Sequence, residues 1–410
     1  MDLRSNLHSF LEFYKVGWKV YKDPEFEPNH PAIYFFREQM KAMVLYTTSK
    51  ERQLPYRSIW HTFVLIQTSV FFASVCYGLT ESIGDNVQIG RDLAFIIGAF
   101  FIIFKMFYFL WFGDDLDDVI NELVKHHPWA WKGPGCVDVR PLKRWSFCLG
   151  FFLASSWSFF LIIFLLLLMT TPLWVQQQNL PFHAAFPFQL HDRSTHPITH
   201  AIIYISQSFL MTYAIVWLMC IEGLSVCIYF ELTFATEVLC LELKHLHRKC
   251  DDNAKLRLET NRLIRFHQKI VEILNRTNHV FHGTLIMQMS VNFALVSLSV
   301  LEAMEARKDL KVVGQFGVLM VLALGHLSMW SMFGDMLSRE SLKISQAAYE
   351  AYDPAKGSKD VYKDLCFIIR SAQNPLIMRA SPFPCFNLVN YAAILNQCYG
   401  ILTFLLKTLE

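Results

Sequence analysis

The stretch Phe386–Leu406, which reads FNLVNYAAILNQCYGILTFLL, lies almost at the end of the chain and contains no charged side chain. A segment of this length can cross a hydrocarbon core of about 30 Å as a single helix. Because polar groups are costly in lipid, those that interrupt the stretch are expected to face protein or water. They are Asn387, Asn390, Asn396, Gln397, Tyr399 and Thr403. The stretch therefore predicts a membrane helix that either anchors the chain or lines a conduit.

The composition of the whole chain also indicates a membrane protein. Hydrophobic residues make up 53% of the 410 positions and charged residues 18%, and the mean hydropathy is +0.30. A typical soluble chain has a charged fraction of about a quarter. The net charge of +2 gives no indication of a nucleic-acid partner. The N-terminus mixes both charge signs and lacks an apolar core, unlike a signal peptide.

Seven stretches are long and apolar enough to span a membrane, which predicts an all-α polytopic fold. They are residues 59–80, 92–112, 146–170, 201–229, 281–301, 312–334 and 386–406. All 15 prolines lie outside these stretches, as uninterrupted helices require. The chain thus divides into a cytosolic N-terminal segment (1–58), spans one to six (59–334) with cytosolic helical extensions at 230–280, a cytosolic anchor segment (335–385) and the last helix (386–410).

Lysine and arginine set the expected orientation. Thirty of them fall in residues 1–58, 113–145, 230–280 and 335–385, whereas six fall in the segments on the other side. An excess of these residues is typical of cytosolic loops. The N-terminus is therefore predicted to be cytosolic and the C-terminus extracellular. This orientation is the reverse of that of a G-protein-coupled receptor.

Amphipathic segments flank the predicted spans. Residues 9–21 predict a helix that lies either at the membrane interface or in the cytosol against the protein. Residues 231–275 predict two helices with a break at 251–253, and residues 335–380 predict two more with breaks near 353 and 357. The apolar faces of these helices need a partner, either within the chain or on a neighbouring subunit.

Motifs for catalysis are missing from the sequence: there is no Gly-rich phosphate loop, nucleophile elbow or pair of intramembrane carboxylates. Lys105 and Glu222 lie within spans, where they either snorkel to the interface or pair with each other. The outer loop between the third and fourth spans has loosely spaced histidines without a cysteine, which favours surface histidines over a zinc site. They are His183, His191, His196 and His200. We therefore expect no enzyme activity, metal or cofactor.

Aromatic and hydroxyl side chains gather in the outer halves of the second, third and fourth spans. A pocket for a small lipophilic molecule has apolar walls and a few polar groups that orient the ligand. Ordinary helix packing or contact with lipid explains the same residues taken singly. The residues that we expect to line such a pocket are Phe95, Phe100, Ser156, Trp157, Phe160 and Tyr204.

The last span has a polar stripe. Asn396, Tyr399 and Thr403 recur every three or four residues and share one helical face. A polar stripe that ends in leucines is typical of a pore wall with a hydrophobic constriction. A stripe buried between helices has the same pattern.

Several short motifs, taken in order, resemble the insect odorant receptor family over essentially the whole chain. They are Val16-Gly17-Trp18, Leu180-Pro181-Phe182 with Phe186-Pro187-Phe188, Arg265-Phe266-His267-Gln268, and YAAILNQCYGILT at Tyr391–Thr403. In the last motif Cys398 and Gly400 replace the family's usual small hydroxyl residues beside Tyr399. The related gustatory receptors end this motif differently. The chain also lacks the extended cytosolic insertion of the shared co-receptor, so it resembles a ligand-tuned subunit.

The resemblance implies an odorant-binding subunit of a ligand-gated, non-selective cation channel. Its expected partners are odorant co-receptor subunits in a heterotetramer, a small volatile odorant, permeating cations and membrane lipids, in the plasma membrane of olfactory sensory neurons. Leu402 and Leu406 match the family's hydrophobic gate, and Met211 and Ile215 match its odorant pocket. A gustatory-type channel and a G-protein-linked receptor are the alternatives. A transporter would show broken spans or internal repeats, and the sequence shows neither.

Overall fold

The computed structural model describes residues 3–23, 26, 32–42, 48–49, 55–126, 140–174, 180–249, 252–305, 310–353 and 358–409. Helices make up all of the regular structure in this part of the chain, which confirms the all-α prediction. The long helices are α4 (Pro55–Glu81), α5 (Asn86–Trp111), α7 (Arg140–Trp174), α8 (Pro197–Lys244), α10 (Asn253–Glu305), α11 (Leu310–Glu350) and α13 (Leu388–Leu409). The others are α1 (Leu3–Lys22), α2 (Ala32–Ala42), α6 (Gly113–His126), α9 (Leu246–Lys249), α12 (Lys359–Ala372) and the 3-10 helix η1 (Pro187–Gln189).

Among the described residues, five helices are long and apolar enough to cross a membrane, by length and composition. They include most or all of the predicted first, second, fourth, fifth and sixth spans, at Ile59–Glu81, Asn86–Trp111, Pro197–Lys244, Asn253–Glu305 and Val313–Glu350. The predicted third and seventh spans fall on α7 and α13. Every predicted span therefore lies wholly or almost wholly in a helix.

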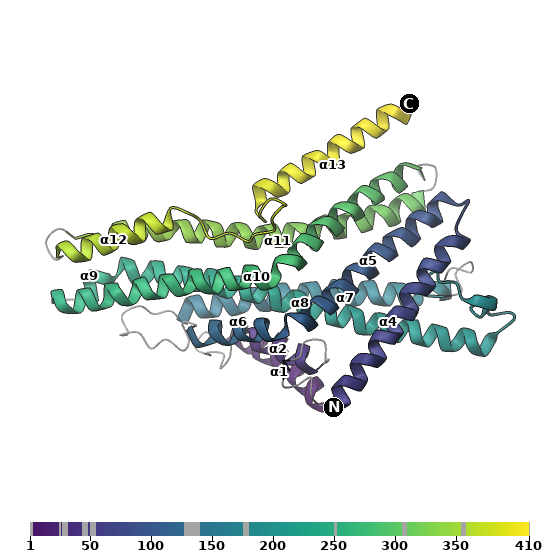
Figure 1. Ribbon diagram of the computed structural model, residues 1–410, viewed down its shortest axis with the longest axis horizontal. Coiled ribbons are helices and arrows are strands. Elements are labelled where there is room, and N and C mark those ends of the chain that lie inside the picture. The colour runs from purple at the N-terminus through teal and green to yellow at the C-terminus, as the bar shows by residue number, and fades with distance from the viewer. Residues whose placement is uncertain are drawn as a thin grey trace.

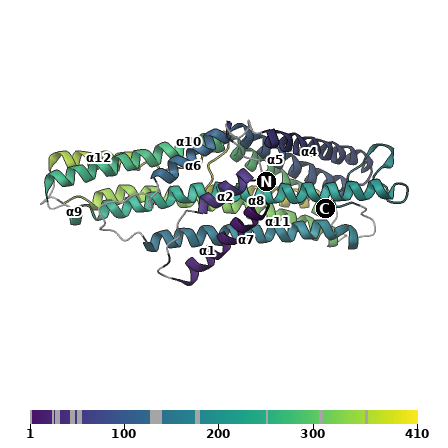
Figure 2. The ribbon, with the colours of Figure 1, turned by 90° about the horizontal axis from the view of Figure 1, so that it is seen from below.

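Three helices continue far beyond a membrane's thickness. Helices α8, α10 and α11 have 48, 53 and 41 residues, whereas a bilayer requires about 20. Their excess length, together with α12, forms the elongated end of the molecule that is on the left in Figures 1 and 2. Helix α8 ends at Lys244 and α10 begins at Asn253, whereas α11 ends at Glu350 and α12 begins at Lys359. These interruptions of the helices confirm the predicted helix pairs. No helix ends at residue 230, 280 or 335, so the extensions are continuous with the spans.

Helix α8 is the centre of the packing. It is buried over most of its length from residue 217 to 243, and α4, α7, α10 and α11 all contact it. Large apolar side chains supply its contacts, because Trp217 and Tyr229 are fully or almost fully buried. Gly223 lets the ring of Phe36 on α2 approach so closely that any Cβ at this position would overlap the ring. Helix α2 is therefore docked against α8, whereas α1 contacts α7 and α2.

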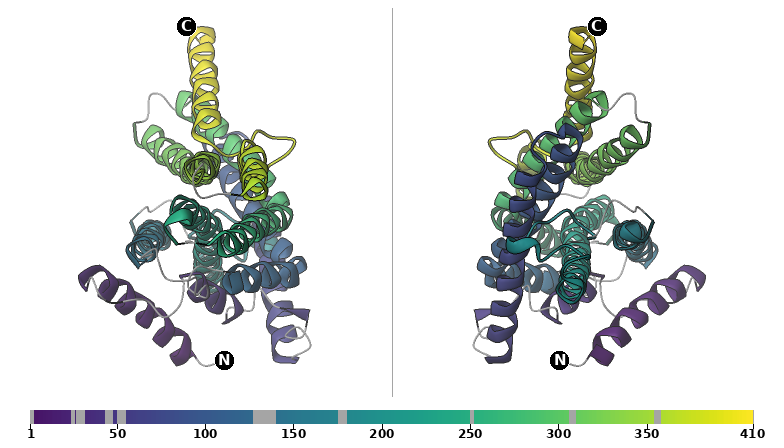
Figure 3. Two further views of the ribbon diagram at one scale, coloured as in Figure 1. Left: turned by 90° about the vertical axis from the view of Figure 1, so that its left-hand side faces the viewer. Right: turned by 90° about the vertical axis from the view of Figure 1, so that its right-hand side faces the viewer.

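Helix α13 stands apart from the bundle, as Figures 1 and 3 show in yellow. Its connection to the rest is at its N-terminal end, where the Tyr391 hydroxyl donates to the Leu324 carbonyl oxygen (3.3 Å). Just before the helix, the ring of Phe386 lies 6.2 Å from that of Trp330 on α11. The Phe386 carbonyl oxygen abuts Gly334, where a Cβ would overlap it. The helix is thus anchored to α11 at one end.

A buried cluster of polar side chains joins four helices inside the membrane domain. Lys105 Nζ on α5 pairs with a carboxylate oxygen of Glu222 on α8, and these residues are 3% and 1% exposed. Lys105 also donates to Gln288 Oε1 on α10 (2.9 Å), and the Trp330 indole N–H on α11 donates to Glu222 Oε2 (2.9 Å). His326 Nε2, also on α11, lies 3.3 Å from Glu222 Oε2. Of the two alternatives for these charges, pairing is confirmed.

Replacement of Lys105 by methionine should lower the melting temperature of the detergent-solubilised protein. The change leaves the Glu222 carboxylate buried without its cation, and removal of one partner from a buried pair costs about 3–5 kcal/mol. The double variant Lys105→Met/Glu222→Gln should recover much of this loss, because it removes both charges and keeps an acceptor for Trp330. Size-exclusion chromatography after heating measures the melting temperatures of the single and the double variant. Equal losses in the single and double variants would contradict stabilisation by charge pairing.

Candidate ligand site and pore helix

Three of the predicted pocket residues lie together where α8 packs on α7. The side chain of Ile215 is 3% exposed. The hydroxyl of Tyr204 donates to the carbonyl oxygen of Met169 on α7 at 2.7 Å. The apolar cluster around Ile215 consists of Leu165, Met169, Met211 and Met219. Methionine side chains are flexible and polarisable, so this contact is one that can adapt its shape to a ligand.

The other predicted pocket residues do not belong to this cluster. Phe95 on α5 contacts Phe182 of the loop between α7 and α8, with ring centroids 5.0 Å apart. Phe100 and Phe160 are about half exposed on the isolated chain, at 46% and 57%. Ser156 is half-buried, and the side chain of Trp157 lies outside the described part of the structure. Three of the predicted residues therefore lie at the α7–α8 contact, Phe95 lies against Phe182, and Phe100 and Phe160 are exposed.

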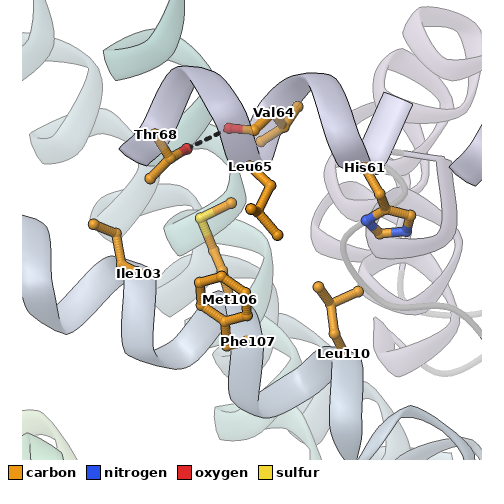
Figure 4. Close-up of a pocket in the computed structure, with 8 residues that line it drawn as sticks. All are labelled: His61, Val64, Leu65, Thr68, Ile103, Met106, Phe107 and Leu110. Atoms are coloured by element: carbon orange, nitrogen blue, oxygen red, sulfur yellow. Dashed lines mark hydrogen bonds between the residues drawn. The ribbon is translucent and has the colours of Figure 1, made fainter. Parts of the chain in front are cut away.

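A small apolar groove lies between α4 and α5 (Figure 4). Its volume is about 20 Å³, whereas pockets for small molecules have about 300–1,000 Å³. The Thr68 hydroxyl beside it donates to the Val64 carbonyl oxygen, so it offers little to a ligand. The lining residues are His61, Val64, Leu65, Thr68, Ile103, Met106, Phe107 and Leu110. This groove could not be predicted from the sequence, because its residues have the ordinary pattern of packed helices.

A larger cavity of about 190 Å³ lies at the other end of the molecule, among α10, α11 and α12. It borders the segment that leads from α12 to α13. Asn278 Nδ2 donates to the Ile377 carbonyl oxygen (2.9 Å), and the Leu376 N–H donates to Ser341 Oγ (2.9 Å). Polar side chains of α10 and α11 therefore hold the connection that precedes α13. This contact was not found from the sequence, since such polar residues are common on solvated helices.

The predicted pore residues lie on the part of α13 that leaves the bundle. Asn396 is exposed, and Tyr399 is 68% exposed. The Thr403 hydroxyl donates to the backbone carbonyl oxygens of Tyr399 (3.1 Å) and Gly400 (3.0 Å). Asn396 and Tyr399 are therefore not buried between helices of this chain. The side chains of Leu402 and Leu406 lie outside the described part of the structure, although both positions belong to α13.

Two of the loop histidines form hydrogen bonds with other groups of the protein. His183 Nδ1 donates to Asp92 Oδ2 (2.9 Å), and His191 Nδ1 accepts the Phe186 N–H (3.2 Å). The described residues include no group of three side chains that could hold a metal ion.

Comparison with known proteins places these features in a family. The model of the 7tm odorant receptor family matches residues 85–399, which is more than half of the chain. The chain is 69% identical to the Drosophila melanogaster protein named "Putative odorant receptor 65c", over 100% of both chains. It is 47% identical to odorant receptor 65a of the same organism, over 96% of this chain and 95% of that protein.

The fold is also similar to a solved receptor. The olfactory receptor OR5 of Machilis hrabei aligns with a TM-score of 0.72 at 15% identity, over 92% of this chain and 99% of that chain. Its structure in complex with eugenol aligns with a TM-score of 0.71 at 16% identity, over 98% of this chain and 99% of that chain. The chain is therefore a multi-pass membrane receptor and not an enzyme, and it belongs to the odorant receptor family.

Proposed function

We propose that this chain is the odorant-binding subunit of a ligand-gated, non-selective cation channel. It forms a heterotetramer with odorant co-receptor subunits in the plasma membrane of olfactory sensory neurons, with its N-terminus in the cytosol and its C-terminus outside. The observation that carries the proposal is α13, whose polar face is exposed and which is joined to the bundle at one end. Such a helix requires further subunits to complete its surroundings.

The proposal that α13 lines a pore rests on the free-energy cost of exposing its polar face to lipid. A polar face with Asn396 and Tyr399 is expensive against acyl chains, whereas the same face around a central axis contacts water. Leu402 and Leu406 are one helical turn apart and would narrow this pathway to a dewetted constriction. Cys398 and Gly400 beside Tyr399 make this subunit's share of the wall different from the family's usual one.

A small volatile odorant binds in the outer half of the membrane domain, at the contact of α7 with α8. Met211 and Ile215 supply an adaptable apolar wall, and Tyr204 supplies the polar group. The Machilis receptor solved in complex with eugenol supports a small, mainly apolar ligand. The ligand opens the gate only to the extent that it binds the open state more tightly than the closed state.

A path for this effect is present in the packing. Glu222 on α8 accepts the indole N–H of Trp330 on α11, and the Trp330 ring contacts Phe386 at the start of α13. A displacement of α8 by a ligand therefore reaches the attachment of α13 through two contacts. Lys105 on α5 pairs with the other oxygen of Glu222, so a displacement of α8 also moves α5.

Leu406→Ser should raise the resting current of cells that express this chain with the co-receptor, because a hydroxyl lowers the barrier to water in the constriction. Voltage-clamp recording before and after an odorant panel measures resting and evoked currents. Leu405→Ser is the matched control, since it places the same group on another face of the helix. Resting and evoked currents equal to those of the unmodified chain would remove Leu406 from the gate. Evoked currents without the co-receptor would contradict the proposed heteromer.

Met211→Ala should shift the half-maximal concentration of at least some odorants about tenfold, since lost methylene contacts in a pocket are worth about 1–3 kcal/mol. The resting current should remain unchanged, because Met211 lies away from α13. Leu166→Ala on α7 is the control, as its side chain is 55% exposed. Unshifted dose–response curves across the whole panel would exclude Met211 from the site.

A further inference from the structure

The segment Leu180–Ala185, in the loop between α7 and α8, is packed into the molecule rather than exposed. Its apolar side chains are among the most buried in the protein: Leu180 is 6% exposed, Phe182 2%, Ala184 3% and Ala185 1%. Loops normally run over the surface, where water satisfies their backbone groups. The burial of this segment therefore needs specific partners, and α4 and α5 supply them.

Phe182 inserts its ring between the two helices. The centroid of this ring lies 5.6 Å from that of Phe71 on α4 and 5.0 Å from that of Phe95 on α5, and both pairs are nearly perpendicular. Edge-to-face contacts of this kind are favourable. Phe182 thus occupies the aromatic surface that Phe95, a predicted pocket residue, would otherwise present to a ligand.

The backbone of the segment is also fitted to α4. The Ala185 N–H donates to the Ser74 carbonyl oxygen at 3.1 Å. A Cβ at Gly78 would lie only 3.3 Å from the Ala184 Cα and from the Ala185 nitrogen, so glycine permits this close approach.

A buried carboxylate secures the segment from its other side. Asp92 on α5 is 1% exposed and accepts hydrogen bonds from Ser82 Oγ, from Gln88 Nε2 (3.0 Å) and from His183 Nδ1 (2.9 Å). Only His183 belongs to the loop, and its side chain is 36% exposed. If His183 leaves, Ser82 and Gln88 still satisfy the carboxylate, so release avoids the full cost of an unpaired buried acceptor.

We propose that Leu180–Ala185 is a movable lid over the outer ends of α4 and α5. Phe182 is its plug, and the hydrogen bond from His183 to Asp92 is its latch. Odorants with an aromatic or other compact apolar group replace the Phe182 ring against Phe71 and Phe95 when the lid lifts, and reach the membrane domain by this route. This inference rests on the proposed odorant binding, but the movement of the lid can be tested without an odorant.

A disulfide across the lid tests the route. In Gly78→Cys/Ala184→Cys, the short approach of the two backbones suits the Cβ separation of about 3.5–4.5 Å that a disulfide requires. Co-expressed with the co-receptor and oxidised, this variant should lose at least nine-tenths of its odorant-evoked current and regain it on reduction. The two single-cysteine variants control for the tight fit at Gly78. If mass spectrometry shows the cross-link and the evoked current is undiminished, odorants do not enter beneath the lid.

Labelling with a membrane-impermeant maleimide tests lid movement without an odorant. Ala185→Cys places a thiol on the buried side of the lid. Its labelling rate on intact cells should rise several-fold when His183→Ala removes the latch, whereas His196→Ala, at an exposed histidine, should leave the rate unchanged. Equal rates in all three backgrounds would overturn the latch. If the unmodified chain gives no odorant-evoked current, the proposed function is contradicted instead. The labelling rates would then still show whether the lid moves.

The charges around His183 give the latch a pH dependence. Asp92 faces it from α5, where Gln88 also donates to Asp92, and Ser82, the residue that follows α4, faces it as well. Glu81, the last residue of α4, lies 3.9 Å from His191 of the same loop as His183. The hydrogen bond to Asp92, aided by the charges of Asp92 and Glu81, raises the pKa of His183 against the opposing effect of burial.

Because the closed lid raises this pKa, protonation stabilises the closed lid. This contribution is fully present below the ordinary histidine pKa of about 6.5 and is lost as the pH rises through the raised value. Labelling of Ala185→Cys, expressed relative to the same thiol in the His183→Ala background, should therefore be slower at about pH 6 than at about pH 8. His191→Gln should retain this dependence. A ratio that does not vary with pH would exclude His183 as its source.

Discussion

The ion pair of Lys105 with Glu222 is the constraint on which the membrane domain depends. Both side chains are almost fully buried, and neither charge is tolerable in that environment without the other. Their donors and acceptors come from α5, α8, α10 and α11, so one polar cluster fixes the positions of four helices. In lipid, where the hydrophobic effect does not drive helices together, van der Waals packing and polar contacts of this kind specify the arrangement.

The cluster also explains the contrast between the bundle and α13. Trp330 belongs to the cluster through its indole N–H and contacts Phe386 through its ring. Beyond this attachment, Tyr399 on α13 is largely exposed. The polar cluster is thus enclosed by the bundle, whereas the polar side chains of Asn396 and Tyr399 on the last helix are exposed on the isolated chain. A bundle joined to the last helix at one end suits the proposed channel, in which binding and gating belong to separate elements.

The helices and their breaks could be predicted from the sequence, because apolar length and local helix-breaking residues determine them. Pairing across the fold could not. Lys105 and Glu222 are 117 residues apart, and either pairing or snorkelling fits their positions. Likewise Phe95 is an aromatic residue of the kind expected in a pocket wall, yet its ring contacts Phe182 of a loop that is distant in the sequence. Met211 and Ile215, which the resemblance implies, and Tyr204 lie at the contact of α8 with α7, and their role in ligand binding stays a prediction.

Two buried carboxylates, Glu222 and Asp92, differ in what remains to satisfy each of them when one donor is lost. Glu222 receives a lysine cation from α5 and an indole N–H and a histidine from α11, so loss of the lysine removes the closest cation from a buried carboxylate. Asp92 accepts one hydrogen bond from Gln88, one turn earlier on α5, and one from Ser82, in the connection between α4 and α5. The third comes from His183, which is partly exposed. Loss of that third donor removes a contact and leaves the acceptor satisfied. The contacts of Glu222 therefore suit a fixed joint between helices, and those of Asp92 suit the proposed latch.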